Sequence, residues 1–232
     1  MKFTFQLFLL LLFTATHLRA QEENINTDRP DQSDGVYTLT KKHFQIEEGV
    51  TIGKNLFVNN LMLRYGLTNS TEIRLLSDVG KIDESNGFLP LTISVKQKII
   101  KQKNLIPAIT AVGYMSYEKI ASKDFQTNNI SYELKLAFEN EVNENFTVSY
   151  NAGLTDEFKT FNYTLNLGYS PIEKLSLFAE YFGSVNSSVQ HNADAGILIL
   201  LYPKLQVDIA CGHSIADSDN RFYTIFGISY KF

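Results

Sequence analysis

The chain has 232 residues, of which 44% are hydrophobic and 20% charged, and it contains 17 Phe, 12 Tyr and no Trp. This composition is too apolar for an intrinsically disordered protein, and a net charge of −4 lacks the basic character of a nucleic-acid-binding protein. One cysteine excludes a disulfide framework and a cysteine-rich zinc site. The length is compatible with a single all-β barrel or sandwich.

Residues 1–20 are predicted to be a secretory signal peptide. Lys2 provides a basic start, residues 7–13 form an apolar run, and residues 14–20 lead to a cleavage site after Ala20, although Leu18 three residues before the cut is not small. The apolar run is too short to cross a bilayer core of about 30 Å as a helix, which disfavours the alternative of an N-terminal membrane anchor. We therefore expect an exported mature chain that begins at Gln21.

Residues 21–42 form a polar segment without the alternation of a strand. The segment contains Asp28, Arg29, Pro30 and Asp31, and the fixed φ of Pro30 stiffens the chain there. If the strands that follow enclose a lumen, these residues are candidates for a plug that folds into it. The alternative is a disordered periplasmic tail, which is common for terminal segments. Both alternatives stay open from the sequence.

Residues 43–232 alternate apolar and polar side chains in runs of about ten, which is the pattern of β-strands with two unlike faces. The clearest apolar face lies in the last run and comprises Phe222, Thr224, Phe226, Ile228, Tyr230 and Phe232. The pattern predicts twelve strands over 43–52, 55–66, 70–78, 89–100, 105–117, 127–139, 144–154, 160–170, 173–184, 189–201, 204–214 and 220–232. We expect an all-β fold with antiparallel, up-and-down topology.

The length of the strands and the place of their charges favour a transmembrane barrel. Runs of about ten residues match the length that crosses a bilayer at a tilt, and tight turns alternate with longer loops as in outer-membrane barrels. The inner face carries Glu72, Arg74, Lys96, Lys98, Glu133, Lys135, Glu180, Asp194 and Asp208. Charges are costly in a dry sandwich core but acceptable in a watery lumen. A soluble sandwich with these charges on its solvent face is the alternative.

A twelve-stranded barrel would place both chain ends on the periplasmic side and enclose a narrow lumen. We expect the nine inner charges to line a selective path for small solutes. The competing interpretation is a network of salt bridges among Glu133, Lys135, Glu180, Asp194 and Asp208 that closes the lumen. In that case the barrel would have a structural or adhesive role.

An enzyme embedded in the outer membrane, such as a phospholipase, is the second class of function. The candidate catalytic residues are His213 beside Ser214, and His191 near Ser187 and Ser188. A hydrolase needs a serine within hydrogen-bond reach of an oriented histidine, and the sequence lacks the Gly-x-Ser-x-Gly elbow. We expect no catalysis, no cofactor and no metal site.

The chain end resembles the assembly signal of bacterial outer-membrane proteins, because Tyr230 and Phe232 share the outward face of the last strand. This resemblance implies that the barrel-assembly machinery and the lipid bilayer are partners. Three further stretches, residues 26–32, 44–47 and 63–67, resemble the meta-pathway phenol-degradation family of outer-membrane proteins in Gram-negative bacteria, whose pattern includes Thr-Asp-Arg-Pro-Asp and Phe-x-Ile-Glu. The resemblance implies an outer-membrane channel or transporter for small, often aromatic, compounds.

Overall fold

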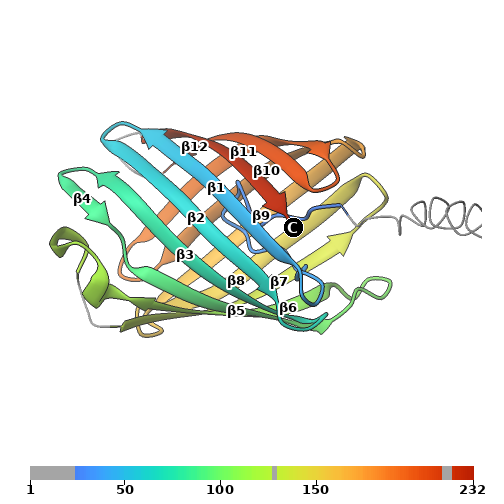
Figure 1. The fold of residues 1–232 in the computed structure, drawn as a ribbon, viewed down its shortest axis with the longest axis horizontal. Coiled ribbons are helices and arrows are strands. Elements are labelled where there is room, and N and C mark those ends of the chain that lie inside the picture. Colours follow the sequence, from blue (N-terminus) through green and yellow to red (C-terminus); the bar gives the residue numbers. More distant parts are fainter. Residues whose placement is uncertain (1–23, 127–129, 216–220) are drawn as a thin grey trace, which may run out of the picture.

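The computed structural model describes residues 24–126, 130–215 and 221–232. The expected signal peptide over 1–20 lies outside the described residues, as do the predicted starts of two strands at 127–129 and at 220. Within the described part, twelve long antiparallel strands form a closed barrel (Figure 1). No helix among the described residues is long and apolar enough to cross a bilayer.

Each long strand pairs with its sequence neighbours, and the first and last strands pair with each other to close the ring. The strands of the ring are β1 (Phe44–Gly53), β2 (Leu56–Gly66), β3 (Thr71–Ile82), β5 (Leu91–Ile100), β6 (Ala108–Tyr117), β7 (Ile130–Glu141), β8 (Phe146–Thr155), β9 (Thr160–Ile172), β10 (Leu175–Val185), β11 (Val189–Tyr202), β12 (Leu205–Ser214) and β13 (Phe222–Lys231). A short strand, β4 (Ser85–Phe88), pairs only with the end of β3. Two 3-10 turns, η2 (Glu118–Ile120) and η3 (Lys123–Phe125), follow β6.

The prediction of twelve strands is confirmed, with two local corrections. Residues 79–88 were expected to be a loop, but β3 continues to Ile82 and turns back as β4. Residues 79–88 therefore form a hairpin although their polar composition is typical of a loop. The turn lies at Asp83, which adopts the positive φ that a tight turn requires. The strand expected from residue 105 begins only at Ala108, after Pro107, which has no N–H for the ladder.

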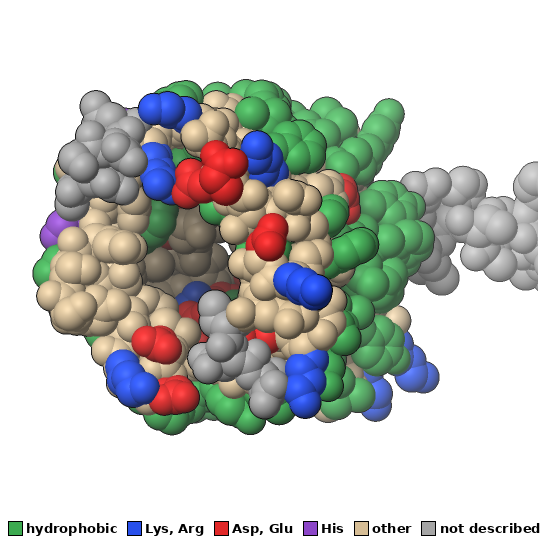
Figure 2. Space-filling model, turned by 90° about the vertical axis from the view of Figure 1, so that its left-hand side faces the viewer, with side chains coloured by type: hydrophobic (Ala, Val, Ile, Leu, Met, Phe, Trp, Pro, Cys, Tyr) green, Lys and Arg blue, Asp and Glu red, His purple; other side chains and the backbone are tan. Residues whose placement is uncertain are grey.

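The barrel is polar inside and apolar outside, the reverse of a soluble protein. The largest fully buried side chains are those of Arg64, Arg74, Lys96, Gln45, Glu47 and Glu72. Every long strand carries exposed aliphatic or aromatic side chains on its outer face. The end view shows hydrophobic side chains around the outside of the barrel (Figure 2). This inversion excludes the soluble sandwich, because a sandwich would bury its apolar face between two sheets.

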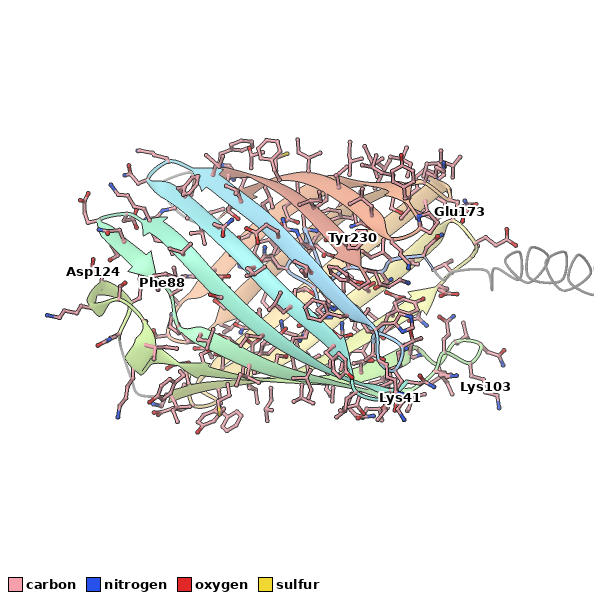
Figure 3. All side chains as sticks on the ribbon, in the orientation of Figure 1. Lys41, Phe88, Lys103, Asp124, Glu173 and Tyr230 are labelled. Carbon is pink, nitrogen blue, oxygen red and sulfur yellow. The ribbon has the colours of Figure 1, made fainter. Side chains whose placement is uncertain are left out.

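The two ends of the barrel differ. We call one end the turn end, because it carries the tight connections after β2, β5, β7, β9 and β11; Lys41, Lys103 and Glu173 lie there (Figure 3). The opposite end, the loop end, carries β4, η2 and η3, with Phe88 and Asp124 (Figure 3). Aromatic rings stack across neighbouring strands near the turn end, as Phe146 does on Tyr169 with centroids 4.5 Å apart. Such rings favour the headgroup level of a bilayer.

Candidate functional site: the lumen and the segment inside it

Residues 24–42, which we call the inner segment, enter the lumen from the turn end and return to it before β1 begins (Figure 1). At the entry, the amide of Ile25 donates to the carbonyl of Pro203 at 2.7 Å. At the return, the amide of Lys42 donates to the carbonyl of Gly66 at 2.8 Å. A Cβ on Gly66 would collide with the backbone of Thr40, so this close approach requires glycine. The segment therefore forms a loop with its tip deep in the barrel.

Asp28 holds the inner segment to a group of wall cations. Its carboxylate lies 2.7 Å from Lys96 Nζ, 2.9 Å from Arg74 Nη1 and 3.5 Å from Arg64 Nη2. These cations come from β5, β3 and β2. Burial alone would raise the pKa of Asp28, but Arg64, Lys96 and Arg74 outweigh burial and lower this pKa to about 2. Asp28 is therefore ionised at neutral pH.

Asp34 makes a second anchor on the same side of the lumen. It lies 2.8 Å from Arg74 Nη1 and 2.9 Å from Lys135 Nζ, and it accepts a hydrogen bond from the Tyr114 hydroxyl at 2.6 Å. The backbone of Asp34 bonds Asn151 in both directions, with the amide donating at 2.7 Å and the carbonyl accepting at 3.1 Å. Burial raises the pKa of Asp34, but Lys135, Arg74 and Lys96 outweigh it and hold this pKa well below its ordinary value.

Wall carboxylates complete this cationic half of the lumen. Arg64 lies 2.5 Å from Glu47 and 2.7 Å from Glu72, and Glu72 also accepts the amide of Leu39 at 2.6 Å. Sequence reasoning missed Glu47, Arg64 and Asp34. The first two were detectable as charges on the inner faces of the first two strands. Asp34 carried no comparable signal, because an irregular segment has no periodicity to show which side chains are buried.

The opposite half of the lumen, built by β8 to β13, is acidic and holds the inner segment with fewer contacts. Arg29 Nη2 lies 3.3 Å from Asp208, and the amide of Gln32 donates to Glu180 at 2.7 Å. Glu180 also accepts a hydrogen bond from the hydroxyl of Ser33. Asp31 accepts a hydrogen bond from Asn166 at 2.5 Å.

Asp194 belongs to the same acidic half. It is the register partner of Glu180 and accepts a hydrogen bond from the Tyr223 hydroxyl at 3.1 Å. Its second carboxylate oxygen is buried and has no hydrogen-bond partner among the described residues. Asp31, Glu180 and Asp194 thus bring three carboxyl groups close together on this side of the lumen.

The remaining predicted residues lie around these two halves. Lys98 lies over the ring of Tyr37, with its Nζ 5.8 Å from the ring centroid. Glu133 lies 3.4 Å from Lys135, and Pro30 lines a cavity at the tip of the inner segment. The competing interpretation, in which five wall residues close the lumen by pairing with one another, is wrong. Lys135, Glu180 and Asp208 bond mainly to the inner segment. The five residues of that interpretation were Glu133, Lys135, Glu180, Asp194 and Asp208. The alternation of the wall strands does not predict which wall residues the inner segment contacts.

The lumen was expected to be narrow, and the inner segment divides the space inside it into separate cavities. A cavity of about 530 Å³ opens toward the loop end and has the tip of the segment as its floor. A smaller one of about 170 Å³ lies between the segment and β7 to β11. A hollow is visible at the loop end (Figure 2).

His191, one of the two histidines considered for catalysis, bonds to tyrosine hydroxyls. His191 Nδ1 lies 2.8 Å from the hydroxyl of Tyr163 and 2.5 Å from that of Tyr181, rather than beside a serine. Within residues 24–126, 130–215 and 221–232, no group of three or more His, Cys, Asp or Glu side chains could hold a metal ion.

Solved outer-membrane channels share this fold. The "KdgM porin" superposes with a TM-score of 0.64 at 12% identity, covering 81% of this chain and 99% of that chain. The "NanC porin" gives 0.63 at 9% identity, covering 82% and 100%. The COG4313 outer membrane channel from Pseudomonas putida F1 gives 0.64 at 12% identity, covering 88% and 100%. At these identities the likeness concerns the fold alone.

Among curated protein sequences, none matches the chain. A family model described as "Putative MetA-pathway of phenol degradation" matches residues 27–232. The match begins at Thr27, so it includes Asp28 and Arg29 of the inner segment as well as every strand of the barrel. The chain therefore belongs to the family of MetA-pathway phenol-degradation proteins, and it has the twelve-stranded fold of outer-membrane channels.

Proposed function

We propose that this protein is an outer-membrane channel for small solutes, exported by residues 1–20 and inserted through its C-terminal Tyr230 and Phe232. The observation that carries the proposal is the inner segment, which is held by ion pairs to both walls of a lumen that would otherwise be open. A barrel that needed only to be stable would fill its lumen with wall side chains, as eight-stranded barrels do. A segment of the chain that narrows a wider lumen instead suits a channel of controlled width.

The solutes that we propose are small and have an apolar or aromatic body. The cavity at the loop end is lined by Leu56, Val58, Leu76, Phe182 and Ile225 beside its polar groups. Apolar side chains that face a lumen are unexpected if water is its only content, and a concave apolar surface with a few polar groups is typical of small-molecule sites. This cavity supports an apolar body, and the family's description supports an aromatic one.

Solute uptake into proteoliposomes tests the proposal. Purified protein is reconstituted, and the uptake of radiolabelled sugars, amino acids and phenolic compounds is compared with that of empty liposomes. We expect uptake of small solutes, and faster uptake for phenolics than for sugars of similar size. A parallel sample of Gly66→Ala, which forces the inner segment away from β2, should take up every solute faster.

Two results would count against the proposal. No uptake by the wild type or by Gly66→Ala would indicate a barrel with a structural or adhesive role and a closed lumen. Release of fatty acids from phospholipid vesicles would indicate the enzyme alternative.

A further inference from the structure

Two cavities of the lumen adjoin each other at the tip of the inner segment. The cavity of about 530 Å³ at the loop end and the cavity of about 170 Å³ on the turn side share two lining residues among those described, Arg29 and Asp31. Both belong to the tip of the inner segment. A solute that moves from one cavity to the other while the segment stays in place must therefore pass these two side chains.

The inner segment is held unequally on its two sides. On the cationic side, Asp28 contacts Arg74 and Lys96, which are almost completely buried, and Asp34 contacts Arg74 and the partly exposed Lys135. On the acidic side, Arg29 makes its ion pair with Asp208 at 3.3 Å and donates a hydrogen bond to the carbonyl of Phe226 at 3.2 Å. The side chain of Arg29 is 10% exposed, toward the cavities. A long side chain held at its tip can swing without moving the backbone.

The titratable side chains along this route are predominantly acidic. Besides Asp31, the lining includes Asp78 in the larger cavity and Glu139 in the smaller one, and Glu180 lies beside Asp31. The buried cations Arg64, Arg74 and Lys96 are matched by carboxylates on the far side of the inner segment. Lys135 lies in an adjoining cavity of about 310 Å³, where Glu133 and Asp34 balance it. Arg29 is the cation that stands in the route itself.

We propose that Arg29 is the gate and selectivity residue of a path that runs beside the docked inner segment, and that this path favours cationic and neutral solutes over anions. In the closed position the guanidinium bonds Asp208 and fills the junction between the cavities. When it swings away, the carboxylates of the route attract an ammonium group and repel a carboxylate, because a narrow low-dielectric passage strengthens both effects. The inference rests on the proposed channel function and names the solute class.

Single-channel recording in planar bilayers tests this inference with KCl gradients across the membrane. The variants are Arg29→Gln, which removes the charge and shortens the side chain, Arg29→Lys, which keeps the charge, and Asp31→Asn, which removes an acid from the junction. Arg221→Gln is the matched control, since Arg221 pairs with Asp83 on the surface of the loop end. Amide hydrogen exchange of residues 24–42 shows in each variant whether the inner segment remains docked.

We expect the wild type to pass K⁺ in preference to Cl⁻. Arg29→Gln should increase the conductance severalfold and strengthen the preference for K⁺, while amides of the inner segment stay protected. Arg29→Lys should increase the conductance less and leave the selectivity close to that of the wild type. Asp31→Asn should weaken the preference for K⁺, and Arg221→Gln should change neither quantity.

Three results would overturn the inference. The first is a wild-type channel that prefers Cl⁻, and the second is an unchanged conductance in Arg29→Gln. The third is loss of amide protection in Arg29→Gln, which would make Arg29 a latch for the whole segment rather than a gate. If a channel conducts but shows one of these results, only this inference fails. If neither ions nor neutral solutes cross in any variant, the proposed channel function fails with it.

Discussion

Gly49 of β1 and Gly227 of β13 are register partners on the inner wall, and together they leave the space that the guanidinium of Arg29 occupies. A Cβ on either glycine would overlap Arg29. Gly227 is also the register partner of Asp208 on β12, which places the carboxylate beside the same space. The two strands that close the barrel, β1 and β13, thus also leave the space in which the Arg29 side chain lies.

We predict that Gly227→Ala displaces Arg29 from Asp208 and increases conductance without unfolding the barrel. The added methyl group meets the far end of a flexible side chain, so Arg29 can move at low cost while the strand keeps its ladder. Planar-bilayer recording measures the conductance, and the gel shift between heated and unheated samples reports the folded barrel. The control is Gly113→Ala, whose Cβ would make only an ordinary contact with Leu134 at 3.6 Å. Equal conductance in Gly227→Ala and Gly113→Ala would contradict the prediction.

Replacing Asp28 should release the inner segment. Asp28→Asn leaves Arg74 and Lys96 with one carboxylate fewer in a buried place, and breaking such a pair costs about 3–5 kcal/mol. Faster amide exchange over residues 24–42 would be the direct sign of release. The comparison is Glu157→Gln, which breaks an exposed pair with Lys159 and should have no measurable effect, because surface ion pairs contribute little. Unchanged exchange in Asp28→Asn would show that other contacts suffice for docking.

Docking of the inner segment should strengthen as the pH falls from neutral toward mild acidity. Burial raises the pKa of Asp31 well above its ordinary 3.8, and the nearby Glu180, Asp28 and Asp194 raise this pKa further. Below this raised pKa the docked segment therefore binds a proton that the released segment gives up, whereas above it Asp31 is ionised in both states. This contribution is fully present below the ordinary pKa and is lost as the pH rises through the raised value.

The measurement is the frequency of large openings in planar bilayers at about pH 5 and about pH 8, on either side of neutrality. We expect fewer openings at the lower pH in the wild type and a weaker pH dependence in Asp31→Asn. The carboxylates of Asp28 and Asp34 stay ionised over this range, because neighbouring cations lower their pKa values. More openings at acidic pH would refute the sign of the effect.

The C-terminal aromatic residues should matter more for assembly in cells than for the stability of the finished barrel. The Phe232 ring contacts Phe44 and Tyr230, with centroids 5.6 Å and 4.8 Å apart, on the outer surface. Phe232→Ala should reduce the amount of heat-modifiable protein in the outer membrane of expressing cells. Purified Phe232→Ala should fold into detergent micelles as well as the wild type. Phe226→Ala is the control, because Phe226 is an outward phenylalanine within β13. An equal loss in cells would remove the case for a terminal signal.

Alternation along the sequence determined the architecture of the barrel, because a strand shows its two faces directly in its residue order. The inward positions of Arg74, Lys96, Glu180 and Asp208 follow from that parity alone. The hairpin of β3 and β4 escaped prediction, since short polar strands look like loops.

The tertiary structure alone decided what those inward charges do. Asp28 meets Lys96 across 68 positions of sequence, and Arg29 meets Asp208 across 179. No local sequence pattern predicts either of these two contacts, because the inner segment has no periodicity. Its partners are set by the closure of β1 on β13. Whether the lumen is open, lined or filled depends on such contacts. The alternation of the sequence therefore determined the strands of the barrel and their inward residues. Only the closed barrel determined which of those residues the inner segment contacts.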